Sequence, residues 1–109
     1  MILVNDGSET EPGDVTIYLD EMAAANAYEA WFADEPHLII GSDGATGKFR
    51  RSDNDKLRIQ FSGTSRPLEE VMPFASRGCA EAERATHLQD ISSFEQLDRA
   101  LRAIEGERK

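Results

Sequence analysis

Residues 14–44 read DVTIYLDEMAAANAYEAWFADEPHLIIGSDG, and this stretch decides the fold. Apolar and polar side chains alternate over residues 15–19, which is the period of a strand with one buried face. Asp20 or Glu21 suits the start of a helix, and Ala24, Tyr28, Trp31 and Phe32 then recur at helical spacing. Pro36 ends this helix because a proline disfavours the α region for the preceding residue and has no N–H to donate. The pattern therefore predicts a strand followed by a helix.

Two turns divide the middle of the chain into three further strands. The apolar run at 38–40 suits an interior strand, and the glycine-rich stretch at 43–47 after it suits a hairpin turn. A short strand is expected at 48–51, followed by a turn at 52–55 that is rich in Asp and Asn. Residues 56–61 then alternate strictly between basic or polar and apolar side chains, which is the clearest strand pattern in the chain.

The last third of the chain predicts helices. A short helix is expected at 68–72, ending before Pro73. Residues 78–87 are rich in Ala, Glu and Arg, and favour a helix with a thin apolar stripe. The capping-box pattern at 92–95 predicts a final amphipathic helix, which Gly106 is expected to end.

These elements predict an α+β fold in the order β-α-β-β-β-(α)-α, with a small, mainly antiparallel sheet of about four strands and helices packed on one face. The length suits a single domain over residues 1–109. Residues 1–13 are expected to form a flexible N-terminal segment, and residues 106–109 a charged tail. The front strand-helix-strand unit also suits a parallel crossover, because spacing alone does not decide between the two arrangements.

Charge is distributed unevenly along the chain, whose net charge is −9. Residues 1–47 contain ten acids and no Lys or Arg, whereas residues 48–109 contain twelve bases and eleven acids. An acidic field repels nucleic acid and speeds encounter with a basic protein, although acidity also serves solubility alone. We therefore expect a basic protein partner and no direct binding to nucleic acid.

The composition also bears on the compartment. The single cysteine excludes an internal disulfide and fits a reducing environment. The first residues lack the positive segment of a signal peptide, and no apolar run reaches the length of a membrane span. We expect a cytoplasmic protein that does not bind membranes.

The sequence contains no convincing catalytic, cofactor or metal motif, so we expect a protein that is not an enzyme. Gly41–Lys48 resembles a phosphate loop in its glycines, but it lacks the required spacing, the hydroxyl after the lysine and the following helix. Cys79 and His87 lie eight residues apart, a spacing that does not bring a nucleophile and a base to one substrate atom. His37 is expected to be a structural or a surface histidine. The acids that flank the central helix and strands lack the alternation of a calcium loop.

A protein-binding surface is the more useful hypothesis. Tyr and Trp are common interface anchors, but at helical spacing Trp31 and Phe32 are expected in the core. Tyr18, on the polar side of its strand, is the better exposed candidate. The predicted partner-binding residues are Tyr18, Glu29, Asp34, Glu35 and Asp43.

The strand-to-helix entry at Tyr18–Glu21, the aromatic helix at Tyr28–Phe32 and the strand-turn at Ile39–Gly44 resemble the small immunity proteins that neutralise bacterial polymorphic or contact-dependent toxins. The resemblance implies a tight, non-catalytic complex in which an acidic surface covers the basic active site of a toxin. The basic strand face at Arg50, Arg51 and Arg58 would then lie away from the partner. A generic regulatory or interaction domain, homodimeric through an uncovered sheet face, and a small enzyme remain as alternatives.

Overall fold

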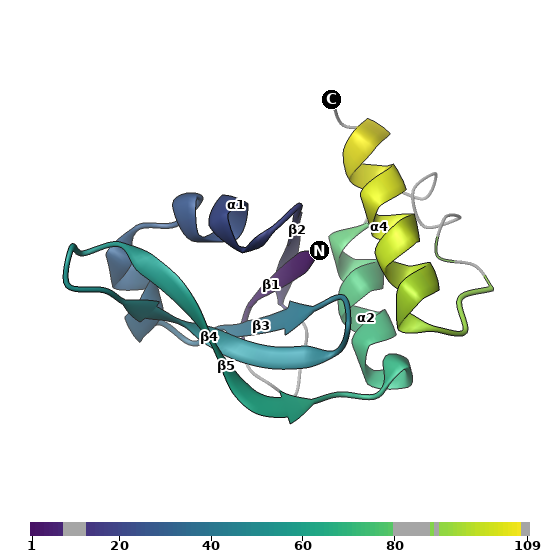
Figure 1. The fold of residues 1–109 in the computed structure, drawn as a ribbon, viewed down its shortest axis with the longest axis horizontal. Helices are drawn as coiled ribbons and strands as arrows, with labels where there is room; N and C mark the ends of the chain where they lie inside the picture. The colour runs from purple at the N-terminus through teal and green to yellow at the C-terminus, as the bar shows by residue number, and fades with distance from the viewer. Residues whose placement is uncertain (8–12, 80–87, 89, 108–109) are drawn as a thin grey trace.

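The computed structural model of the chain describes residues 1–7, 13–79, 88 and 90–107. Five strands form one antiparallel sheet in the order β2-β1-β3-β4-β5, and helices pack on it (Figure 1). The predicted α+β class is confirmed, with one strand more than expected. The elements are β1 (Ile2–Asp6), β2 (Asp14–Tyr18), α1 (Glu21–Asn26), the 3₁₀ helix η1 (Ala30–Asp34), β3 (Leu38–Gly41), β4 (Ala45–Arg51), β5 (Leu57–Ser65), α2 (Leu68–Gly78) and α4 (Phe94–Glu107).

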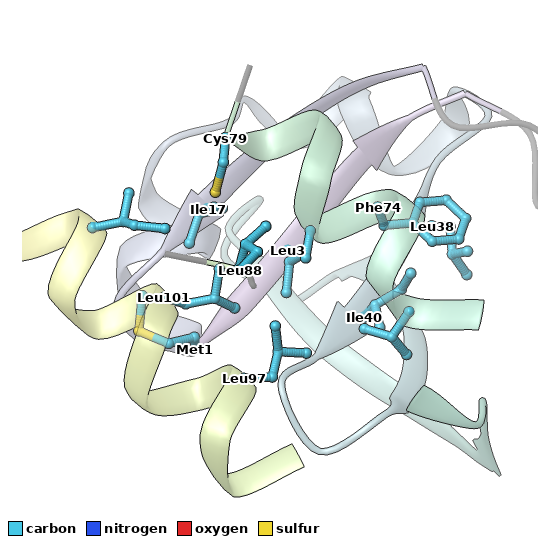
Figure 2. Packing of buried hydrophobic residues seen from close by; sticks show 13 residues of the cluster. Met1, Leu3, Ile17, Leu38, Ile40, Phe74, Cys79, Leu88, Leu97 and Leu101 are labelled. Atoms are coloured by element: carbon cyan, nitrogen blue, oxygen red, sulfur yellow. The ribbon is translucent and has the colours of Figure 1, made fainter. Parts of the chain in front are cut away.

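Helices cover both faces of the sheet, not one face alone. The long helices α2 and α4 lie on one face, where Figure 2 shows Leu3 and Ile40 of the sheet near Leu97 of α4. The short α1 and η1 lie on the opposite face and bury Ala24 and Phe32 there. The reason is that β3 is buried at every position, so both of its faces need a cover.

Strand β1 occupies the centre of the sheet, which corrects the expectation of flexibility for residues 2–6; residues 8–12 of the expected segment 1–13 lie outside the described residues. Leu3 pairs with Ile17 of β2 on one side and with Ile40 of β3 on the other. Its neighbour Val4, like Leu3, is fully buried. Because β1 is antiparallel to both neighbours, β2 and β3 run parallel to each other with β1 between them.

The helix expected from Asp20 to Pro36 is broken into two pieces. Asp20 caps α1 as its residue type predicts, because its carboxylate accepts a hydrogen bond from the Ala23 N–H at 2.8 Å. The α-helix ends at Asn26, and a separate 3₁₀ helix begins at Ala30. The break lets the chain change direction over the sheet and place its aromatic residues in the second core.

Helix α2 continues through Pro73 to Gly78, although a stop before Pro73 was expected. A proline inside a helix costs about 3 kcal/mol. The apolar face of α2 offsets this cost, because Val71 and Phe74 are buried and each contributes about 1.5–3 kcal/mol. Most of the helix expected at 78–87 lies outside the described residues.

Helix α4 is capped by Ser93, one residue later than expected. The Ser93 hydroxyl accepts a hydrogen bond from the Gln96 N–H at 3.2 Å. The helix continues to Glu107, beyond the expected end at Gly106. The predicted apolar face is confirmed, because Leu97 and two later residues, Leu101 and Ile104, are fully buried.

Candidate functional site

The exposed side of the segment from Leu19 to Glu35 combines apolar and acidic side chains. Met22 is 73% exposed and Trp31 55% exposed, and Leu19 joins them as an exposed large apolar residue. This segment contains five acids and no Lys or Arg. Buried Ala24 and Phe32 hold it against the sheet from the inner side. We define the α1–η1 surface by its exposed residues Leu19, Asp20, Glu21, Met22, Glu29, Trp31 and Glu35.

Trp31 lies on the outside of η1, which corrects its expected place in the core. Its indole N–H donates a hydrogen bond to a Glu29 carboxylate oxygen at 2.6 Å. Its ring meets the Phe32 ring edge-on, with the centroids 6.1 Å apart. Consecutive helical residues point in different directions, and in this turn Phe32 points into the core while Trp31 points to solvent. Trp31 is therefore an exposed aromatic ring that is held in one orientation.

A cluster of aromatic side chains packs between η1 and the sheet. The Tyr28 ring stacks on Phe32 at 4.4 Å between centroids, and Tyr18 meets Tyr28 edge-on at 5.9 Å. Burial raises the pKa of Tyr28 well above its ordinary value, and the nearby Tyr18 hydroxyl raises it further. Tyr18 thus packs partly against this core, and is not the exposed anchor that the sequence favoured.

His37 is buried and structural, as predicted. Its Nε2 accepts a hydrogen bond from the Phe49 N–H at 2.8 Å. Because Nε2 is an acceptor, Nδ1 carries the proton and donates to the main-chain oxygen of Glu35 at 2.7 Å. Both ring nitrogens are therefore used within the fold, and His37 ties the end of η1 to β4.

Asp34 lies on η1, but its charge is compensated within the chain. Its carboxylate forms an ion pair with Arg51 at 2.8 Å, and the same arginine donates to the Ala30 carbonyl at 3.0 Å. Asp34 therefore holds η1 to β4. Of the predicted acids on this segment, Glu29 and Glu35 form no ion pair with any described basic side chain.

Asp43 lies at the opposite end of β3 from η1. Its carboxylate accepts a hydrogen bond from the Ala45 N–H at 3.0 Å and so closes the turn between β3 and β4. Gly44 in this turn has a φ of 92° and lies against the ring of Phe94 on α4. Asp43 thus belongs to a turn beside α4, and the structure does not bring it together with Glu29 and Glu35.

The remaining candidates for chemistry give no site. Within the described residues, no three side chains of the types His, Cys, Asp and Glu gather closely enough to hold a metal ion. Cys79 is buried in the core under α2, while His87 lies outside the described residues. No helix in the described part of the chain is long and apolar enough to cross a membrane.

Comparisons of the chain with models of protein families, with curated proteins and with solved structures found no match. The geometry of the α1–η1 surface therefore carries the functional inference.

Proposed function

We propose that this protein is a non-catalytic binding module, an immunity-type inhibitor, which covers a basic surface of its partner with the α1–η1 surface. The observation that carries the proposal is the exposed Trp31, held by Glu29 in a segment without Lys or Arg. Tryptophan is among the residues that most often dominate binding energy at interfaces. A ring that is already held in place loses little conformational freedom on binding.

The charges around Trp31 select a basic partner. The carboxylates of Glu29 and Glu35 are exposed and offer acceptors to Lys or Arg. An arginine placed between Glu29 and the face of Trp31 would gain both an ion pair and a cation–π contact. The acidic field would also speed the encounter with such a partner, and added salt would slow it.

An inhibitor of a toxin that acts on nucleic acid fits this surface well. Active sites that bind phosphates are lined by basic side chains, so an acidic and aromatic surface complements them. The proposal therefore places the α1–η1 surface over the basic active site of the partner. Inhibition would follow from covering that site, without any chemistry by this protein.

Self-association through the edge of the sheet is a second candidate with less support. Strand β5 is an edge strand of nine residues, most of them exposed. However, it carries the charged Arg58, and near Gly63, whose φ is 82°, its pairing with β4 is irregular. Charges and irregularities of this kind oppose edge-to-edge pairing of strands. We therefore favour a different protein as the partner.

Affinity capture from a native lysate tests the proposal when charge-matched variants are compared. We expect the wild-type protein to capture one basic protein in stoichiometric amount. The variant Glu29→Lys/Glu35→Lys should fail to capture it, whereas the control variant Asp14→Lys/Glu70→Lys should still capture it. The control makes the same change in net charge at exposed positions on β2 and α2 that are not part of the α1–η1 surface. Higher salt should weaken the complex, and wild-type protein should inhibit the activity of the purified partner.

Two results would contradict the proposal. One is the capture of no partner, in repeated trials, from cells in which the genes of the candidate partners are known to be expressed. The other is a partner that both double variants retain equally, because binding would then not depend on the α1–η1 surface.

A further inference from the structure

A cavity of about 440 Å³ lies over β4 and β5, next to the start of α2. It opens on the face of the sheet opposite to the α1–η1 surface. Thr46 pairs with Ile40, whose side chain lies in the core under α2 and α4, and alternate residues of a strand share a face. Lys48 and Arg50 therefore lie on this face too. The cavity is thus separate from the protein-binding surface proposed above.

The lining of this cavity is basic, although the chain as a whole is acidic. Among the described residues, three cationic side chains, Lys48, Arg50 and Arg66, line it together with hydroxyl and amide groups, and no Asp or Glu lines it. Arg66 also lies over the ring of Phe74, with 5.4 Å from its guanidinium carbon to the ring centroid. Arg66 follows the end of β5 next to α2, whereas Arg50 lies nearer the turn at the other end of the hairpin, so the positive charges are spread along β4 and β5.

The positive charges that β4 and β5 place on this face repel one another. Arg50 lies directly opposite Arg58 on the neighbouring strand, and like charges in that position destabilise a sheet. Lys48 is two residues away on the same face. Among the described residues, no acid forms an ion pair with Lys48, Arg50 or Arg58. A bound anion would remove this repulsion.

The inner wall of the cavity presents hydroxyl groups. The hydroxyl of Thr64 lies 2.8 Å from that of Thr46 and 2.7 Å from that of Ser62. An irregularity in the pairing of β4 with β5 brings these three side chains together, because Ala45 pairs with Ser65 but Gly47 pairs with Phe61. Such irregularities redirect side chains and are common beside binding sites. Hydroxyl groups can donate to anionic oxygens.

We propose that this cavity binds a small molecule that carries a polyphosphate group. Several neighbouring cations call for a ligand with several negative charges, which a single carboxylate does not supply. The volume is in the range of small-molecule sites, and Leu38 gives the lining an apolar part for the rest of the ligand. Lys48 acts here from the face of a strand, and not as the lysine of a phosphate loop.

Amide chemical shifts recorded during titration with sodium triphosphate, ATP and adenosine test the proposal. We expect triphosphate and ATP to shift amides at 46–50 and 60–66, with a dissociation constant of about 1 mM or below. Adenosine should not bind. The variant Lys48→Gln/Arg50→Gln should weaken binding about tenfold or more, because each arginine or lysine contact to phosphate is charge-assisted. The control Lys56→Gln/Arg99→Gln loses the same charge outside the cavity lining and should bind like wild type.

Three outcomes would overturn the proposal, once thermal melting has shown that both double variants fold. One is the absence of shifts at 46–66 with triphosphate and ATP. Another is equal weakening by both double variants, which would indicate unspecific attraction to a basic surface. The third is binding of a single-stranded oligonucleotide without binding of triphosphate or ATP, which would mark a nucleic-acid surface.

Discussion

The indole N–H of Trp31 donates to the carboxylate of Glu29 at 2.6 Å, and this contact holds an exposed aromatic ring in place on an acidic surface. Buried Phe32, the next residue, fixes the same turn from the inside. Phe32 thus stabilises the fold, whereas Trp31 remains available for a partner.

This difference predicts unequal losses of stability for substitutions at the two neighbouring positions. Phe32→Ala should lower the free energy of unfolding by about 3–5 kcal/mol, because it leaves a cavity among the rings of Tyr28 and Phe49. Trp31→Ala should lower it by less than about 1 kcal/mol, because more than half of the side chain is exposed. Urea denaturation of both variants measures the difference. Equal losses would show that Trp31 is a core residue.

Trp31 is the only tryptophan, so fluorescence reports on it directly. We expect an emission maximum typical of an exposed indole and ready quenching by acrylamide. Glu29→Ala should lower the fluorescence anisotropy of the side chain, because it removes the hydrogen bond that holds the ring. The exposed Glu21→Ala serves as a control and should leave the anisotropy unchanged. An unchanged anisotropy in Glu29→Ala would contradict the held orientation.

His37 should be required for stability. His37→Ala leaves the buried N–H of Phe49 without its acceptor and removes a ring that packs against Phe32 and Phe49. The expected loss is about 2–3 kcal/mol in the free energy of unfolding. Glu35→Ala, which keeps the main-chain oxygen that His37 binds, should change it by less than about 0.5 kcal/mol. Amide exchange of Phe49 should accelerate only in His37→Ala.

The lowered pKa of Asp98 predicts that the folded protein loses stability in acid. Partial burial would raise its pKa, but hydrogen bonds from Ser42, Arg102 and the amino group of Met1 outweigh burial and hold the pKa well below its ordinary value of 3.8. Since the unfolded chain then takes up the proton more readily, the stabilisation is complete above about pH 5 and is lost progressively below about pH 4.

The variant Asp98→Asn should therefore be about 2–3 kcal/mol less stable than wild type at pH 6, and the difference should shrink towards pH 3. Glu95→Gln removes an exposed ion pair on the same helix, and we expect a loss below about 0.5 kcal/mol. Urea denaturation between pH 3 and pH 6, with any tag at the C-terminus, measures both. A difference for Asp98→Asn that does not change with pH would contradict the role of its charge.

Sequence reasoning found the features that depend on neighbouring residues. The cap at Asp20, the turn around Gly44 and the strict alternation over Leu57–Phe61 all depend on local backbone and side-chain preferences. Strand β1 was missed because its central position depends on pairing with β2 and β3 on both sides. Likewise, Pro73 is accepted inside α2 only because distant residues bury the apolar face of that helix.

The candidate site was harder to predict, because it depends on contacts between distant residues. Arg51 compensates Asp34 across 17 positions, and no local pattern marks that pair. The helical spacing did contain a usable signal for Trp31: one narrow apolar stripe cannot bury both Trp31 and Phe32, since adjacent residues point in different directions. The positive charge at 48–66 was visible in the sequence, but its position in a cavity was not.

The most direct test of the proposed function is the dissociation constant of the complex with the purified partner, measured by calorimetry for three proteins. We expect Trp31→Ala to weaken binding about thirtyfold or more relative to wild type, as the loss of an interface anchor does. The control Asp14→Lys/Glu70→Lys should stay within about threefold of wild type. A dissociation constant for Trp31→Ala within about threefold of wild type would contradict the assignment of the α1–η1 surface as the binding site.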